Sequence, residues 1–279
     1  MNFRDFLGRI ERKADHHTAS GKAIMRILHS NALPGFPYNS NGEFGFKFSF
    51  AFQPIVNACN QEIISFEALV RGPHGEPSNS VFAQVNNHDF GRFDEMCRKK
   101  AIHLASRLNI PNSLCLNLSA QGLYQIDSSI ITTFHASMES GIPTENIIFE
   151  VLETANLTDQ HSLLQYLKLI NDFGFKTSID DFGAGYSGLK LLVKYQPTYI
   201  KLDRHLIGDI QDNPIKQSVF MGIQQICNQL SVEIVAEGVE QAAEYRWLSQ
   251  VGVKIFQGYY FARPAFEALP EVSYKAYAI

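Results

Sequence analysis

The chain has 279 residues, of which 45% are hydrophobic, so it can bury the core of one large domain or two small ones. Its formal net charge is −4 and its pI is about 6.1, which gives no sign of the basic face that binds polymeric nucleic acid. The four cysteines form no C-x-x-C pair, so we expect reduced thiols. The charged N-terminus does not resemble a signal peptide, and no apolar run would span a bilayer, so we expect a soluble cytoplasmic protein.

The first 45 residues differ in pattern from the rest. Apolar residues recur at helical spacing between Phe3 and Ile10, and residues 31–45 are rich in turn-forming types. We therefore predict a short helix and a linker at 1–45 and one domain at 46–279. The segment is shorter than an ordinary sensor domain, so we expect it to influence dimerisation or to bind a protein partner.

From residue 48 onward, strand and helix patterns alternate. Residues 48–57 and 62–71 are predicted to form two strands of a hairpin, followed by a helix at Arg92–Leu108. Further strands are predicted at 113–119, 146–153, 175–181, 198–203, 232–238 and 253–258, with amphipathic helices such as 161–174 and 215–230 between them. Repeated βα units of this number favour an α/β fold closed into a (β/α) barrel over an open sheet.

Polar side chains stand at or near the end of nearly every predicted strand. The set is Glu67, Asn117, Glu150, Asp180, Asp181, Lys201, Asp203, Glu237 and Gln257. Single members have ordinary explanations, because an aspartate pair or a glutamate can cap a helix and Lys201 can pair with Asp203. In a barrel, however, these strand ends share one face, where active sites lie. We therefore expect the set to gather in one mouth.

So many carboxylates in one mouth need positive charge. Two carboxylates about 4 Å apart repel by roughly 4 kcal/mol at an effective dielectric constant near 20, and Lys201 is the obvious cation. Either several carboxyl groups are protonated or bound cations fill the site. A ligand set with oxygen atoms alone favours Mg²⁺, Mn²⁺ or Ca²⁺ over zinc. The Asp180–Asp181 pair can bridge two ions about 3.5–4 Å apart, an arrangement suited to phosphodiester cleavage.

An ordered series of motifs resembles the EAL-domain family, the phosphodiesterases specific for cyclic di-GMP. The motifs are FQPIV at 52–56, FEALVR at 66–71, NLS at 117–119, FEVLE at 149–153, IDDFGAGYSGL at 179–189, IKLDR at 200–204, VAEGVE at 235–240 and FQGYYFARP at 256–264. The resemblance implies a modified TIM (β/α)8 barrel in which one early strand is antiparallel. It also implies a role in bacterial signalling, in which cyclic di-GMP is opened to linear pGpG with Mg²⁺ or Mn²⁺, and a homodimer.

The resemblance assigns roles residue by residue. Ligands of the first metal ion would be Glu67, Asn117, Glu150 and Asp180, and those of the second Asp180 and Asp181, with Glu237 nearby. Lys201 would hold and help activate the attacking water, with Glu67 and Glu237 beside it, and Glu237 acting as ligand or as base. Substrate contacts would come from Gln53, Arg71, Asp203, Glu240 and Gln257. Glu153 would anchor the loop at 182–187, which couples the site to the dimer interface in this family.

The chain departs from the family pattern at two places. Residues 72–95 replace the usual stretch after Arg71, and Ala184 stands where threonine is common. Neither change removes a predicted ligand, but the first alters the wall beside the guanine pocket. Two alternatives therefore stay open. One is a non-catalytic switch that binds cyclic di-GMP or a protein partner, and the other is a barrel enzyme acting on another phosphate ester.

Overall fold

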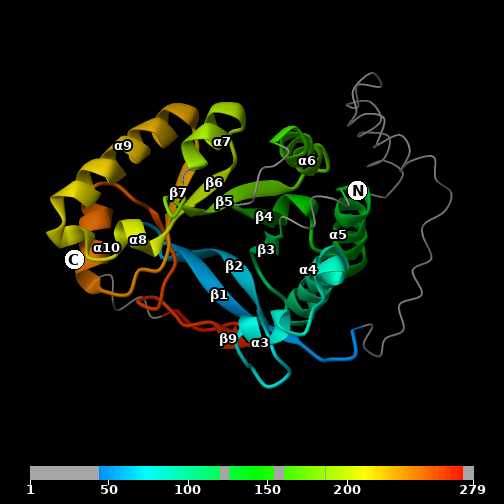
Figure 1. The fold of residues 1–279 in the computed structure, drawn as a ribbon. Coiled ribbons are helices and arrows are strands. Elements are labelled where there is room, and N and C mark those ends of the chain that lie inside the picture. Colours follow the sequence, from blue (N-terminus) through cyan, green and yellow to red (C-terminus); the bar gives the residue numbers. More distant parts are fainter. Residues whose placement is uncertain (1–43, 120–125, 154–159, 186, 273–279) are drawn as a thin grey trace.

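The computed structural model describes residues 44–119, 126–153, 160–185 and 187–272 (Figure 1). Almost all of the predicted N-terminal helix and linker at 1–45 lies outside the described residues, so that prediction and the domain boundary at 46 stay predictions. All four cysteines are free, as expected for reduced thiols. Within the described part of the chain, no helix combines the length and the apolar composition needed to cross a bilayer.

Within the described residues, nine strands form one sheet that closes into a barrel, which confirms the predicted fold class. Its strands are β1 Ser49–Asn57, β2 Glu62–Arg71, β3 Ser113–Leu118, β4 Ile147–Leu152, β5 Lys176–Phe182, β6 Tyr199–Leu202, β7 Glu233–Ala236, β8 Ile255–Phe256 and β9 Ala265–Phe266. Strands β2 to β8 follow one another in parallel. Strand β1 closes the barrel, because it pairs antiparallel with both β2 and β8. This is the antiparallel early strand that the resemblance implied, whereas β9, which pairs with β1, was not predicted.

Helices surround the barrel (Figure 1). They are α3 Ser78–Phe82, α4 Phe90–Arg107, α5 Ile126–Ser140, α6 Gln160–Asp172, α7 Gly188–Lys194, α8 Arg204–Ile207, α9 Pro214–Leu230 and α10 Ala242–Gln250, with short 3-10 turns η1 Asn87–Asp89, η3 Thr144–Asn146 and η4 Ile210–Asp212. The start of α9 is set by Asn213, whose side chain accepts hydrogen bonds from the N–H groups of Ile215 and Lys216. The predicted helix at 92–108 is α4, which begins two residues earlier and ends one residue earlier.

The segment that departs from the family pattern folds against the end of the barrel. Residues 72–95 form α3, η1 and the beginning of α4. Their aromatic residues pack together, because the ring centroids of Phe82 and Phe90 are 5.8 Å apart and those of Phe90 and Phe93 are 6.2 Å apart. These elements are too short to show a helical period, which is why the sequence did not predict them.

Candidate metal site at the barrel mouth

The two-residue period of the strands places the predicted ligands in one layer. A small apolar cluster inside the barrel contains Cys115, Ile148, Val235 and Ile255 among its members. Because side chains two apart on a strand point to the same face, the residues two positions further along also face the barrel axis. Those residues are Asn117, Glu150, Glu237 and Gln257. The site is therefore the polar layer above an apolar plug, as in other closed barrels.

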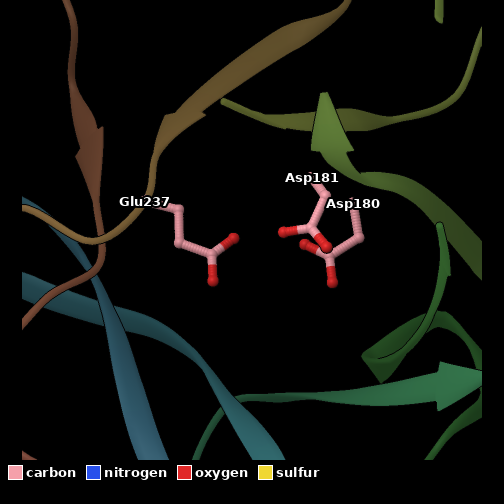
Figure 2. A group of neighbouring side chains, drawn as sticks. All are labelled: Asp180, Asp181 and Glu237. Atoms are coloured by element: carbon pink, nitrogen blue, oxygen red, sulfur yellow. The ribbon is translucent and has the colours of Figure 1, made fainter. Parts of the chain in front are cut away.

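A bulge brings both aspartates of the Asp180–Asp181 pair to this layer. Consecutive residues of a regular strand point to opposite faces. Here the register between β5 and β6 shifts between Ile179 and Phe182, and Asp181 has a φ of 52°. A bulge of this kind can re-aim a side chain. As a result, carboxylate oxygens of Asp180, Asp181 and Glu237 lie within 4.8 Å of one another (Figure 2).

Lys201 lies among four carboxylates and is only 1% exposed. Its Nζ lies 3.1 Å from Glu67 Oε2 and from Asp180 Oδ1, and 3.2 Å from Glu150 Oε1 and from Glu237 Oε2. An ammonium group has three N–H donors, so it cannot hydrogen-bond all four partners at once. The carboxylates therefore outnumber the positive charge that the described residues place here.

The pKa values record this imbalance. Burial raises the pKa of Glu150 well above its ordinary value, and neighbouring carboxylates add to the rise, although Lys201 opposes it. The pKa of Glu237 is raised for the same reasons. Burial also raises the pKa of Asp181 to about 6, helped by the charges of Asp180 and Asp203. Burial opposes the charge of Lys201, yet the carboxylates led by Asp180 hold its pKa well above its ordinary range.

These residues fit divalent cations. Glu150 Oε2 is buried and has neither a hydrogen-bond nor an ion-pair partner among the described residues, and three further buried carboxylate oxygens (Glu150 Oε1, Asp180 Oδ1 and Glu237 Oε2) form ion pairs with the Lys201 ammonium. An unpaired buried carboxylate oxygen is costly unless a cation approaches it. All of the donors are oxygen atoms, which suits Mg²⁺ or Mn²⁺. The Asn117 amide nitrogen donates to Glu67 Oε1 at 3.2 Å, which leaves the amide oxygen as the group able to bind a cation.

The predicted substrate contacts divide into two groups. Gln257 Nε2 donates to Glu67 Oε2 at 2.6 Å and to Gln53 Oε1 at 3.4 Å, so both glutamines lie beside the site layer. Arg71 borders the same cavity as Glu67, Asp180 and Asp181.

Asp203 and Glu240 have other partners. Asp203 caps α8 by accepting from His205 N at 2.8 Å, and Glu240 Oε2 lies 3.3 Å from Arg204 Nη2. The plain Lys201–Asp203 ion pair that the sequence left open does not form, because the Lys201 ammonium pairs with the strand-end carboxylates instead.

Glu153 contacts the loop after β5. Its two carboxylate oxygens accept hydrogen bonds from the backbone N–H groups of Gly183, Gly185, Ser187 and Gly188, at 2.7, 3.2, 2.8 and 2.7 Å. Glu153 is 3% exposed, so these charge-assisted bonds are shielded from water. The carboxylate thus binds the backbone of this loop, while the role of the loop in coupling the site to a dimer interface stays a prediction.

A cavity of about 730 Å³ opens beside the site. One part is lined by Glu67, Arg71, Asn117, Asp180 and Asp181, and the other by apolar and aromatic residues of β1, α3 and α4 together with Asp94 and Arg98. Neither Asp94 nor Arg98 stands out in the amino-acid sequence as a site residue. The signal available was an acid and a base four residues apart on a predicted helix, a spacing common on solvated helix faces.

The chain is similar to known proteins over most of its length. A family model described as the EAL domain matches residues 44–264. The blue light- and temperature-regulated antirepressor BluF of Escherichia coli is 27% identical, over 81% of this chain and 56% of that protein. The probable cyclic di-GMP phosphodiesterase PdeG of Escherichia coli is 37% identical, over 76% of this chain and 44% of that protein. The chain thus spans about half the length of these relatives.

Solved structures show the same likeness. A standalone EAL protein from Vibrio cholerae, solved with cyclic di-GMP bound, is 40% identical with a TM-score of 0.78, covering 83% of this chain and 98% of that one. BlrP1 of Klebsiella pneumoniae, solved with manganese and cyclic di-GMP, is 35% identical with a TM-score of 0.78, covering 86% of this chain and 59% of that one.

Proposed function

Because the chain belongs to the EAL-domain family, we propose that it is a metal-dependent phosphodiesterase that hydrolyses cyclic di-GMP to linear pGpG and so lowers a signalling nucleotide. The observation that carries this proposal is the cluster of Glu67, Glu150, Asp180 and Glu237 around Lys201, with Asp181 beside it. A relative named as a probable cyclic di-GMP phosphodiesterase and a related structure that holds cyclic di-GMP support the choice of substrate.

Two divalent cations, Mg²⁺ or Mn²⁺, would neutralise the phosphate and lower the pKa of a bound water. Related BlrP1 was solved with manganese, which supports this choice. Glu67, Asn117, Glu150 and Asp180 would hold the first ion. Asp180 and Asp181 would hold the second, with Glu237 as a further ligand or as base.

The protein residues orient the reactants. Lys201 donates a hydrogen bond to the attacking water, whose oxygen forms a new bond to phosphorus as its proton passes to a carboxylate such as Glu237. The P–O3′ bond breaks, and the leaving O3′ takes up a proton from solvent water. Arg71 binds the phosphate. Gln53, Gln257, Asp203 and Glu240 would contact the nucleotide.

A product assay tests this function. The purified protein is incubated with cyclic di-GMP and either Mg²⁺ or Mn²⁺, and the products are separated by chromatography. We expect pGpG from the wild type and from Glu233→Ala, which changes an exposed carboxylate, but none from Glu67→Ala. Absence of pGpG at high protein concentration would contradict the proposal. Turnover retained by Glu67→Ala would show that the metal assignment is wrong. A panel of other phosphate esters tests whether the substrate is a different one.

A non-catalytic switch is the second candidate. Two observations favour it: the similarity to the antirepressor BluF, and the wall that α3 and the start of α4, both within residues 72–95, build beside the cavity. Calorimetric titration with cyclic di-GMP in the presence of Mn²⁺ separates the two candidates. Tight binding without pGpG formation supports the switch, and pGpG formation supports the enzyme.

A homodimer is part of the proposal. Uncovered apolar side chains on α7 and α9 support it, since Leu189 is 53%, Val193 83%, Ile215 78% and Val219 48% exposed. Helix α7 begins directly after the loop that Glu153 holds, so pairing there would reach the site through that loop. Light scattering after gel filtration should give twice the monomer mass for the wild type and a monomer for Val193→Glu with Ile215→Glu.

A further inference from the structure

Helix α4 carries a buried ion pair that the proposed mechanism does not use. Asp94 is 8% and Arg98 1% exposed, and Arg98 Nη1 donates to Asp94 Oδ2. The other two guanidinium nitrogens of Arg98 hydrogen-bond to α5: Nη2 donates to Ser129 Oγ, and Nε donates to Thr133 Oγ1 at 3.2 Å. A buried ion pair of this kind is seldom a net source of stability.

The second oxygen of Asp94 contacts the end of strand β3. Asp94 Oδ1 accepts a hydrogen bond from Ser119 N at 3.2 Å. The last paired residues of β3 and β4 are Leu118 and Val151, so Ser119 lies just beyond the ladder. Asp94 therefore supplies an acceptor where the neighbouring strand no longer does, and it ties the strand end to α4.

Two residues before Ser119 stands Asn117, a predicted metal ligand. Its amide donates to Glu67 Oε1, so the Asn117 side chain is aimed at the carboxylate cluster. Arg98 reaches the adjacent strand as well, since its guanidinium carbon lies 5.8 Å from the ring centroid of Phe149, the residue before Glu150. Asp94, Arg98, Asn117 and Ser119 all border the cavity beside the site.

We propose that Asp94 is a positioning residue for the metal site: it fixes the carboxyl end of β3 through Ser119 N, and Arg98 fixes Asp94. This inference rests on the proposed function, because it takes Asn117 to be a metal ligand. Hydrogen-bond partners behind a ligand orient it, and losing them typically costs about 10–100-fold in metal affinity or activity. Asp94 does not touch the metal position itself and acts through Asn117.

Manganese affinity, measured by calorimetry without nucleotide, tests the inference. We expect Asp94→Ala to weaken Mn²⁺ binding about 10–100-fold. Asp94→Asn keeps one acceptor oxygen and should lose less. Ser119→Pro removes the donor N–H without changing Asp94 or Arg98, and proline is compatible with the extended residue before it. We expect Ser119→Pro to weaken Mn²⁺ binding as much as Asp94→Ala does. It therefore tests the positioning role of Asp94 even if Asp94→Ala does not fold.

Two further variants separate positioning from general stability. Tyr166→Phe removes a hydroxyl that lies 3.0 Å from Ser129 Oγ at the far end of the same buried network, and it should leave Mn²⁺ affinity unchanged. In an Asn117→Ala background, Asp94→Ala should cause no further loss. The inference would be overturned if Asp94→Ala lowered Mn²⁺ affinity as much in the Asn117→Ala background as in the wild type. It would also be overturned if both Asp94→Ala and Ser119→Pro bound Mn²⁺ with wild-type affinity.

The Mn²⁺ titration also distinguishes the positioning role of Asp94 from the proposed phosphodiesterase function. A wild-type protein that forms pGpG yet binds no Mn²⁺ overturns the positioning role alone. A wild-type protein that binds Mn²⁺ with the expected dependence on Asp94, yet leaves cyclic di-GMP intact, overturns the proposed function alone.

Discussion

The Glu153 carboxylate holds the start of α7, because Gly188 N donates to Glu153 Oε1 at 2.7 Å. Three more backbone N–H groups of the same loop donate to this carboxylate. Glu153→Gln keeps the size of the side chain but turns one acceptor oxygen into an amide donor that faces N–H groups. Leaving buried donors unsatisfied costs about 1–3 kcal/mol, so we expect urea unfolding to show a loss of about 2 kcal/mol together with reduced turnover. Glu233→Gln, at the exposed start of β7, is the control and should change neither.

Lys201 compensates the buried carboxylates in the absence of metal. Removing one partner of a buried charge cluster costs about 3–5 kcal/mol, so Lys201→Met should lower the free energy of unfolding by that amount at pH 8 in the presence of a chelator. The loss should be smaller at pH 5 than at pH 8, because the carboxyl groups with raised pKa values bind more protons as the pH falls. Mn²⁺ should restore part of the stability but no turnover. Lys254→Met changes an exposed lysine and should behave as the wild type; equal losses in the two variants would contradict this role of Lys201.

Asp181 makes the metal-free protein less stable as the pH rises. Its pKa is raised from 3.8 in the unfolded chain to about 6 in the folded protein, chiefly by burial. The folded state therefore holds a proton that the unfolded state releases, and the stabilisation is complete below pH 3.8 and lost as the pH rises to about 6. Thermal unfolding in a chelator should show the melting temperature falling across this window, relative to Asp181→Asn. With Mn²⁺ the trend should reverse, because metal binding needs the ionised carboxylate. Identical pH profiles for wild type and Asp181→Asn would refute the assignment.

Gly258 allows the segment after β8 to pass Val239. A Cβ at position 258 would lie 2.0 Å from the Val239 carbonyl oxygen and 2.4 Å from its nitrogen, both backbone atoms that cannot rotate away. Its φ of 157° adds strain for any other residue. Gly258→Ala should lose more than about 4 kcal/mol of unfolding free energy. Gly222→Ala on α9, where a Cβ meets nothing within 4 Å, should instead gain about 0.5–1 kcal/mol. Denaturant unfolding of both variants checks the contrast.

Local pattern predicted much of the barrel. Short apolar strands alternating with amphipathic helices placed β3 to β8 and α4 close to where they lie. The elements that the sequence did not predict are short or depend on contacts between residues far apart in the chain. Strand β9 has two residues and exists because it pairs with β1, more than two hundred positions away. The sequence did not single out Asp94, because an acid and a base four residues apart on a helix are common on solvated faces. Packing against α5 buries the Asp94–Arg98 pair in the folded protein.

The sequence by itself determined which oxygen-bearing side chains stand at the strand ends. Strands and their order can be recognised from residues that are neighbours in the chain, through the two-residue period of each strand and the repeated βα units. The bulge that turns Asp181 toward Asp180, the four carboxylates around one lysine and the tie from Asp94 to Ser119 were decided only in the tertiary structure. Each of these depends on distances between segments far apart along the chain, and electrostatic energy follows those distances rather than the order of the residues.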